Sequence, residues 1–223
     1  MLSPLPPELL DLIVDYLRDE PIALKACCLV SKLWIHRTRR LLFAHVEFLD
    51  RVATPIESWM GLFPEPFDSP AHFARSLSIR GFESVTTAVT HARTWVHPFC
   101  HLVHLGVTTD DAAADDDHVS LAQLQRLSPT LTPLSLIRCH TLLSDIFDLI
   151  CSFPLLEDLR LIRFGPDGGY GDINGWNTTT SPKFTGSLHL TGEVGSITLG
   201  LLNLPGGLHF SKIEVSCPDC HAE

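Results

Sequence analysis

The sequence predicts a mixed α/β protein in two parts: a helical module over residues 1–48 and, over residues 49–223, an irregular repeat of short parallel strands and helices. Three observations predict this class. The first 48 residues contain three apolar segments of helical length. An apolar pattern typical of a short strand then recurs every 25 to 31 residues. Finally, 45% of the 223 residues are hydrophobic, which is enough to bury a sizeable core.

The first predicted helix opens the helical module. Pro6 and Pro7 suit the first turn of a helix, because the N–H that proline lacks is not needed there, and Glu8 favours the positive end of the helix dipole. Apolar residues then follow at three- and four-residue steps, the spacing of an amphipathic helix: Leu9, Leu10, Ile13, Tyr16 and Leu17.

Two further helices are predicted before residue 48. Residues 18–21 interrupt the first helix, and Ile22–Val30 forms a second helix that is almost wholly apolar. Ser31 can cap a third helix, which carries Trp34. Three short helices have little interior, so we expect part of their apolar surface to be covered by another polypeptide. The alternative is that they begin a larger all-helical core.

Three features of this module occur together and in order: the opening LPPELL, the apolar step to Ile13 and Leu17, and the segment CLVSKLW with Val30, Ser31 and Trp34. In this order they resemble the F-box motif. In that family the motif docks onto the Skp adaptor of cullin-RING ubiquitin ligases, and the rest of the chain binds the protein to be ubiquitinated. The resemblance implies adaptor contacts by Leu5, Pro6, Leu10, Ile13, Leu17, Leu24, Val30 and Trp34.

A second pattern, apolar-x-x-apolar-x-apolar, recurs after the module. A short strand needs it when alternate residues face inward and one earlier residue turns back toward the core. Its middle positions are Val46, Leu77, Leu105, Leu134, Leu159, Leu188 and Ile213, at steps of 31, 28, 29, 25, 29 and 25 residues. The copy around Leu188 is the weakest, because Thr185 occupies its first apolar place. This spacing predicts short parallel strands that stack on their neighbours.

Helical returns and inserts are expected between the strands. The clearest return is Leu142–Phe153, which Pro154 ends, and Leu121–Leu127 and Glu83–Trp95 are fainter ones. Three stretches are expected as inserts that interrupt the stacking: Pro55–Ala71, Asp110–His118 and Gly165–Pro182.

Two exposed-looking aromatic residues in the last insert, Tyr170 and Trp176, are the candidates for binding a target protein, because aromatic side chains provide much contact area at little entropic cost. The alternative is that they fold back over the nearest repeat. The five aspartates between Asp110 and Asp117 are expected to form a solvated loop.

A strand and a helix at this period resemble leucine-rich repeats, whose units span about 20 to 29 residues. An F-box followed by such repeats is a known family arrangement, and LPGGLHFSKI (residues 204–213) is similar to a segment of fungal F-box proteins. The chain departs from the repeat pattern at the turns, where Asn or Cys is usual and only Cys139 fits. We therefore expect an irregular solenoid. Because no capping helix follows Val215, we also expect either a longer parent protein or a covered end.

Metal-binding and catalytic patterns are weak. Cys217 and Cys220 have the spacing of a zinc-binding pair, and a second cluster lies at His97–His104. The two would be four strands apart, about 19 Å, which is too far for one ion. No nucleophile elbow, phosphate-binding loop or HExxH motif is present. We predict no enzyme, metal or cofactor, and keep a zinc-dependent enzyme or sensor as an alternative.

The formal charge of −10 disfavours nucleic acid and anionic membranes as partners, because both attract a surplus of Lys and Arg. The short basic stretch at Arg37, Arg39 and Arg40 is expected to be a solvated helix face. Without a membrane span or a signal peptide, the expected location is intracellular, cytoplasmic or nuclear, with the seven cysteines reduced.

These observations lead to one functional prediction and one alternative. The prediction is a substrate-recognition subunit of an SCF-type cullin-RING ubiquitin ligase, which holds a Skp-type adaptor with its helices and an unknown target protein with its repeats. Catalysis would then come from proximity, with the chemistry supplied by other subunits. The alternative is a protein-interaction scaffold that uses the same surfaces outside any ligase.

Overall fold

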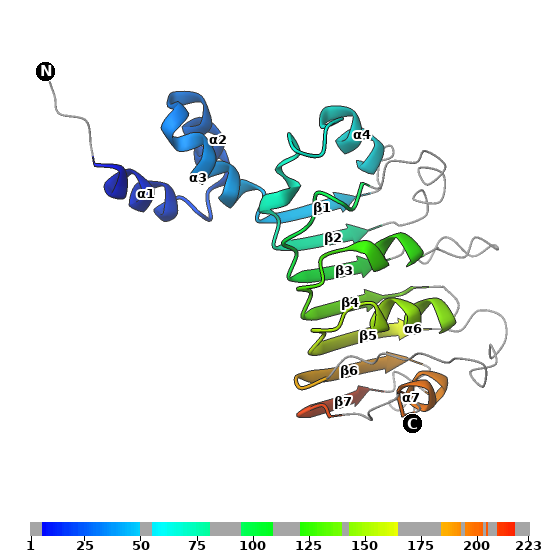
Figure 1. Ribbon diagram of the computed structural model, residues 1–223. Coiled ribbons are helices and arrows are strands. Elements are labelled where there is room, and N and C mark those ends of the chain that lie inside the picture. Colours follow the sequence, from blue (N-terminus) through cyan, green and yellow to red (C-terminus); the bar gives the residue numbers. More distant parts are fainter. Residues whose placement is uncertain are drawn as a thin grey trace, which may run out of the picture.

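The computed structural model describes residues 6–49, 55–80, 95–108, 121–139, 143–164, 184–192, 195–202, 204 and 209–216. Within these ranges the protein is a mixed α/β structure with a seven-stranded parallel sheet. Three helices precede the sheet: α1 (Pro7–Tyr16), α2 (Pro21–Val30) and α3 (Lys32–Leu42). Figure 1 places them beyond the β1 edge, with α3 leading into the first strand.

The three N-terminal helices lie where the sequence predicts them, except that α2 begins one residue earlier than predicted, at Pro21. Pro7 lies in the first turn of α1, and the chain leaves that helix before Arg18. Ser31 separates α2 from α3, and its Oγ accepts a hydrogen bond from the backbone N–H of Leu33 at 3.3 Å, which confirms the predicted cap.

The interior of the helix module is small. Its buried residues are Val14 of α1, Leu24 and Cys27 of α2, and Thr38 of α3. The Thr38 hydroxyl donates to the carbonyl of Trp34 at 2.5 Å, so burial leaves this polar group satisfied. So few buried residues leave most apolar side chains of these helices outside the interior.

The seven strands are paired in chain order, β1 to β7, and every pair is parallel. They are β1 (His45–Leu49), β2 (Ser76–Arg80), β3 (His104–Thr108), β4 (Pro133–Ile137), β5 (Asp158–Phe164), β6 (Ser187–Gly192) and β7 (Lys212–Ser216). The register confirms the predicted spacing, because the middle positions pair successively: Val46, Leu77, Leu105, Leu134, Leu159, Leu188 and Ile213.

One face of the sheet carries the core. In β1 to β4 and in β6 the middle position and the residue two later are buried, while the residues between them are not. This alternation is the period of a strand with one covered face. Figure 1 shows the helical segments gathered along that covered side.

In the described part of the chain, five helical segments lie between the strands: α4 (Pro55–Leu62), the 3₁₀ turns η1 (Pro70–Phe73) and η3 (Leu121–Arg126), α6 (Leu143–Cys151) and α7 (Gly195–Leu202). α6 confirms the clearest predicted return, and its Ile146, Phe147, Leu149 and Ile150 are buried against the sheet. η3 lies where the fainter helical return Leu121–Leu127 was predicted. The predicted helix at 83–95 lies almost entirely outside the described residues.

Two sequence-based expectations are wrong in detail. The stretch Pro55–Ala71, expected as an insert, contains α4 and the beginning of η1, and Trp59 of α4 packs edge-on against Phe48 at a centroid distance of 5.6 Å. At the weak strand copy the buried side chain is Phe184, not the exposed Thr185, and Phe184 stacks on Phe210 at 4.6 Å.

None of the helices in the described ranges is long and apolar enough to cross a membrane.

Candidate functional site

The described residues present two candidate binding surfaces, and the first lies on the three N-terminal helices. Eight large apolar side chains of these helices are exposed, and together we call them the apolar helix surface: Leu9, Leu12, Ile13 and Tyr16 on α1, Ile22, Leu29 and Val30 on α2, and Leu33 on α3. Exposed apolar residues in this number on so few helices are typical of an interaction surface.

The periodicity of α1 explains why its apolar residues remain in water. Leu10, Val14 and Leu17 recur at four- and three-residue steps and turn toward the other helices, with Val14 only 1% exposed. The remaining apolar residues of α1 form a second stripe on the other side, and Tyr16 in that stripe is 89% exposed. The helix therefore has one stripe for its own bundle and one that its bundle does not cover.

The structure distributes the predicted adaptor contacts unevenly. Pro6, Ile13 and Val30 are exposed, with Ile13 at 43% and Val30 at 71%. Leu10, Leu17 and Trp34 are half-buried, and Leu5 lies outside the described residues. Sequence reasoning did not name four of these exposed residues as adaptor contacts: Leu9, Leu12, Tyr16 and Leu33. Leu9 and Tyr16 already belong to the predicted apolar stripe of the first helix, and Leu12 lies three residues after Leu9.

The expectation for Leu24 is wrong. Its side chain is 1% exposed and fills the interior of the helix module, so it is not available to an adaptor. The physical reason is that α2 is apolar almost throughout, and apolarity alone does not identify which side of such a helix faces its own bundle. Leu24 instead supports the helices that present the exposed residues.

An ion pair fixes α1 against α3. Arg37 Nε donates to Asp15 Oδ1 at 2.8 Å, and its Nη2 contacts Oδ2, which makes the pair bidentate. The hydrogen bond from Arg37 holds the pKa of Asp15 below its usual value, and Asp15 in turn raises the pKa of Arg37. Arg37 is therefore a structural residue and not part of a freely solvated basic face.

The second candidate surface is the uncovered face of the sheet. Residues from all seven strands line a hollow of about 890 Å³, which we call the sheet groove, and among them are Ser78, Gly106, Ser135, Arg160, His189 and Glu214. In β2 to β6 these are the outward-facing positions that alternate with the core residues, whereas Glu214 lies on β7, whose residues are all exposed. Sequence analysis did not name them, although the same period that identifies the core positions also identifies their neighbours.

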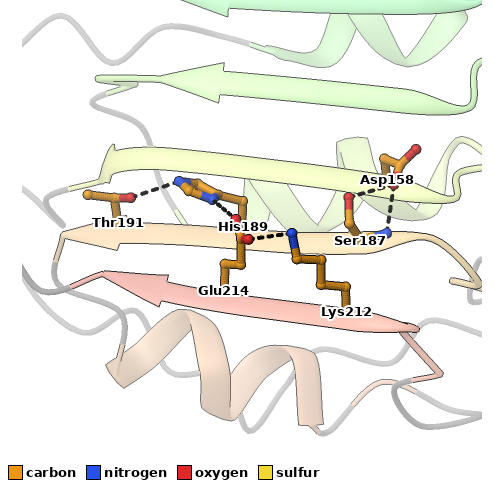
Figure 2. A network of polar contacts seen from close by, with 6 residues as sticks. All are labelled: Asp158, Ser187, His189, Thr191, Lys212 and Glu214. Carbon is orange, nitrogen blue, oxygen red and sulfur yellow. Dashed lines mark hydrogen bonds and ion pairs between the residues drawn. The ribbon is translucent and has the colours of Figure 1, made fainter.

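At the β7 end of the sheet groove, charged side chains neutralise one another. Figure 2 shows Glu214 between two partners: Oε1 lies 2.5 Å from Lys212 Nζ, and Oε2 lies 3.0 Å from His189 Nδ1. Lys212 first, and then His189, lower the pKa of Glu214 through these hydrogen bonds. The other ring nitrogen of His189 lies 3.3 Å from Thr191 Oγ1.

The carboxylate of Asp158 binds the neighbouring strand. Its Oδ1 accepts hydrogen bonds from the backbone N–H of Ser187 at 2.6 Å and from the Ser187 hydroxyl at 2.7 Å (Figure 2). Gly186 makes room for this contact, because a Cβ at that position would overlap the Asp158 carboxylate.

At the β1 end of the sheet groove, Glu47 pairs with Arg80 at 2.9 Å. His104 Nδ1 lies 3.2 Å from the Ser76 hydroxyl. Burial, and then the charge that His45 carries when protonated, lower the pKa of His104. His104 is consequently neutral near pH 7 and contributes a hydrogen-bonding ring rather than a charge.

The remaining candidate residues of the sequence analysis fall largely outside the described residues. Tyr170, Trp176, Cys217 and Cys220 lie outside the ranges that the structure describes. Within those ranges no group of three or more His, Cys, Asp or Glu residues is placed to hold a metal ion. Cys139 is buried, and its thiol contacts the carbonyl of Val107 at 3.8 Å, the kind of backbone contact expected at a turn.

The two surfaces differ in chemistry, since one is apolar and helical and the other is polar and lies on a sheet. Comparisons with protein-family models, with curated proteins and with solved structures found no match for this chain.

Proposed function

We propose that this chain is the substrate-recognition subunit of an SCF-type cullin-RING ubiquitin ligase, with its helix module docking onto a Skp-type adaptor and its repeat region binding a target protein. The observation that carries the proposal is the apolar helix surface, which the module leaves in water next to a sequence that resembles the F-box motif. Burial of this surface against an adaptor would remove that unfavourable exposure.

The physical basis of the docking is apolar burial. Full burial of one Leu or Ile side chain contributes about 1.5–3 kcal/mol, and a stable protein interface of standard size covers about 1,600 Å². A few side chains of the apolar helix surface at the centre of such an interface would be enough, because a few buried side chains usually dominate the affinity. The ion pair between Asp15 and Arg37 supports the proposal further, because it holds α1 and α3 in one arrangement before binding.

The sheet groove is the proposed surface for the target protein. It spans all seven strands and lies on a different part of the chain from the apolar helix surface. One chain could therefore hold adaptor and target at the same time. Proximity to the ligase's other subunits would then suffice for ubiquitin transfer.

The test is co-purification of the full chain with a Skp-type adaptor. Ile13→Asp and Val30→Asp place a carboxylate on the apolar helix surface, and we expect affinity to fall by about a hundredfold or more, since a buried unpaired charge is costly. Leu62→Asp is the matched control, because Leu62 is similarly exposed but belongs to α4. Adaptor binding that survives both helix substitutions in a folded protein would refute the proposal.

A separate readout distinguishes a ligase subunit from a scaffold. Reconstitution with the adaptor, cullin and RING subunits should give ubiquitin transfer to a bound target only if the chain works within a ligase. Adaptor binding without any transfer would favour the scaffold.

A further inference from the structure

We propose that the sheet groove selects target proteins through an acidic segment, whose carboxylates pair with Arg160 at the centre of the groove. The identification of this ligand as a part of the target rests on the proposed function above. The chemistry of the groove is argued independently of it.

The first argument is the balance of charges among the described residues. The carboxylates of this face already have partners: Glu47 pairs with Arg80, Glu214 with Lys212 and His189, and Asp158 accepts two hydrogen bonds from Ser187. Arg160 is exposed in the groove, and no hydrogen bond or ion pair is formed by it within the described ranges. Among the described charged residues of this face, Arg160 is therefore the one that has neither an ion-pair partner nor a hydrogen-bond partner, whereas Asp158 keeps its charge but is held by Ser187.

The second argument is the shape of the groove beside Arg160. In the same row of the sheet, the three preceding strands contribute only small residues: Ser135 of β4, Gly106 of β3 and Ser78 of β2. This floor crosses three strands, or about 14 Å from Ser78 to Arg160 at strand spacing. An extended peptide could lie across it with its backbone close to the sheet and a carboxylate at the guanidinium.

The third argument is that a basic segment fits poorly. Lysines or arginines of a basic segment would be repelled by Arg160. To pair with Glu47 or Glu214 they would have to displace Arg80, or Lys212 and His189. A carboxylate instead gains the bidentate geometry that guanidinium groups favour, with no pair to break.

The experiment measures binding of labelled ten-residue peptides to the full chain by fluorescence anisotropy. The probe alternates Glu and Gly, and matched peptides replace every Glu by Gln or by Lys. We expect binding of the Glu peptide alone, weakened by added salt because the attraction is electrostatic. Equal binding of the Glu and Gln peptides, or preference for the Lys peptide, would overturn the proposal.

Three variants locate the binding. Arg160→Gln should weaken the Glu peptide by about tenfold, the usual effect of losing one charge-assisted hydrogen bond. Gly106→Leu should weaken it as well by filling the floor, and it should leave the fold intact because a Cβ at Gly106 would find no atom nearer than 3.9 Å. Arg126→Gln removes an exposed arginine of η3 and should have no effect. Unchanged affinity in both groove variants would refute the assigned site.

A further arm separates carboxylates from phosphate. In a third peptide each Glu is replaced by Gln except for one central phosphoserine, and inorganic phosphate is added as a competitor of the Glu peptide. Binding of the phosphoserine peptide without binding of the Glu peptide would overturn the proposal in favour of a phosphate site. Binding of the Glu peptide that survives millimolar phosphate would support it.

The outcome is separable from that of the adaptor test. Ile13→Asp should leave the affinity for the Glu peptide unchanged, and Arg160→Gln should leave adaptor binding unchanged. If the chain binds the Glu peptide but does not bind the adaptor, only the proposed ligase function is refuted. If the chain binds the adaptor but does not bind the Glu peptide, only the acidic-segment proposal is refuted.

Discussion

The substitution of glycine by alanine should have opposite effects on stability at two helical positions of this protein. Gly200 of α7 lies against Phe147 of α6, so a Cβ at position 200 would come closer than 3.0 Å to two atoms of the ring and within 3.2 Å of a third. Gly61 of α4 has no atom within 4 Å of the same position.

The magnitudes follow from these distances. Alanine in place of glycine stabilises a helix by about 0.5–1 kcal/mol, and Gly61→Ala should gain the lower part of that range because it lies near a helix end. At Gly200 the same gain is outweighed, because carbon atoms rest about 3.5 Å apart and the ring must retreat by more than about 1 Å. Phe147 is 1% exposed, so its ring would have to move within the packed interior. Overpacking should leave Gly200→Ala less stable by about 1–2 kcal/mol.

Urea unfolding followed by far-UV circular dichroism measures both effects, provided that the slope against denaturant is unchanged. A double-mutant cycle with Phe147→Leu tests the cause. Removing the ring should make Gly200→Ala less costly, with a coupling of about 1 kcal/mol between the two positions. Stabilisation by Gly200→Ala, or strict additivity with Phe147→Leu, would refute the close approach of α7 to α6.

Three further predictions concern titratable groups. The pKa of Asp15 is lower in the folded than in the unfolded protein. Its pair with Arg37 therefore stabilises the fold above about pH 4, and this contribution is lost as pH falls through the folded pKa. The difference in unfolding free energy between wild type and Asp15→Asn should accordingly shrink on acidification. The NMR titration of His104 should have its midpoint below about 6.5, so acid should destabilise the fold through this group, and His45→Ala should raise that midpoint. Burial raises the pKa of Cys139 to about 12, so iodoacetamide should leave this thiol unmodified until the protein is unfolded in urea, and rapid labelling of the native protein would contradict its burial.

The strands and the first helices were predictable from the sequence because their signals are local and periodic. The register from Val46 to Ile213 follows from the period of two within each strand and the recurrence every 25 to 31 residues. Ser31 could be identified as a cap because serine is favoured at the start of a helix, where its hydroxyl can accept a hydrogen bond from the backbone N–H two residues later.

The features that could not be predicted from the sequence depend on contacts between residues that are distant in the chain. The sequence of α7, GSITLGLL, contains two glycines and β-branched residues, so its intrinsic helix propensity is low. Its burial, with Gly200 against Phe147, is a contact between distant parts of the chain that local patterns do not report. Leu24 was misassigned for a related reason, since the side of an apolar helix that faces its own bundle is decided by the partner helices. Arg160 was missed because nothing local marks an unpaired charge.

The pairing of strands only with their neighbours in the chain bears on how such a molecule can change over evolutionary time. No strand is inserted between two earlier ones, so duplication or loss of one strand with its return segment would not require the remaining chain to be rethreaded. Each such event would lengthen or shorten the sheet groove by about 4.8 Å, one strand spacing. The polar face of the sheet could thus change in discrete increments while the three N-terminal helices stay the same.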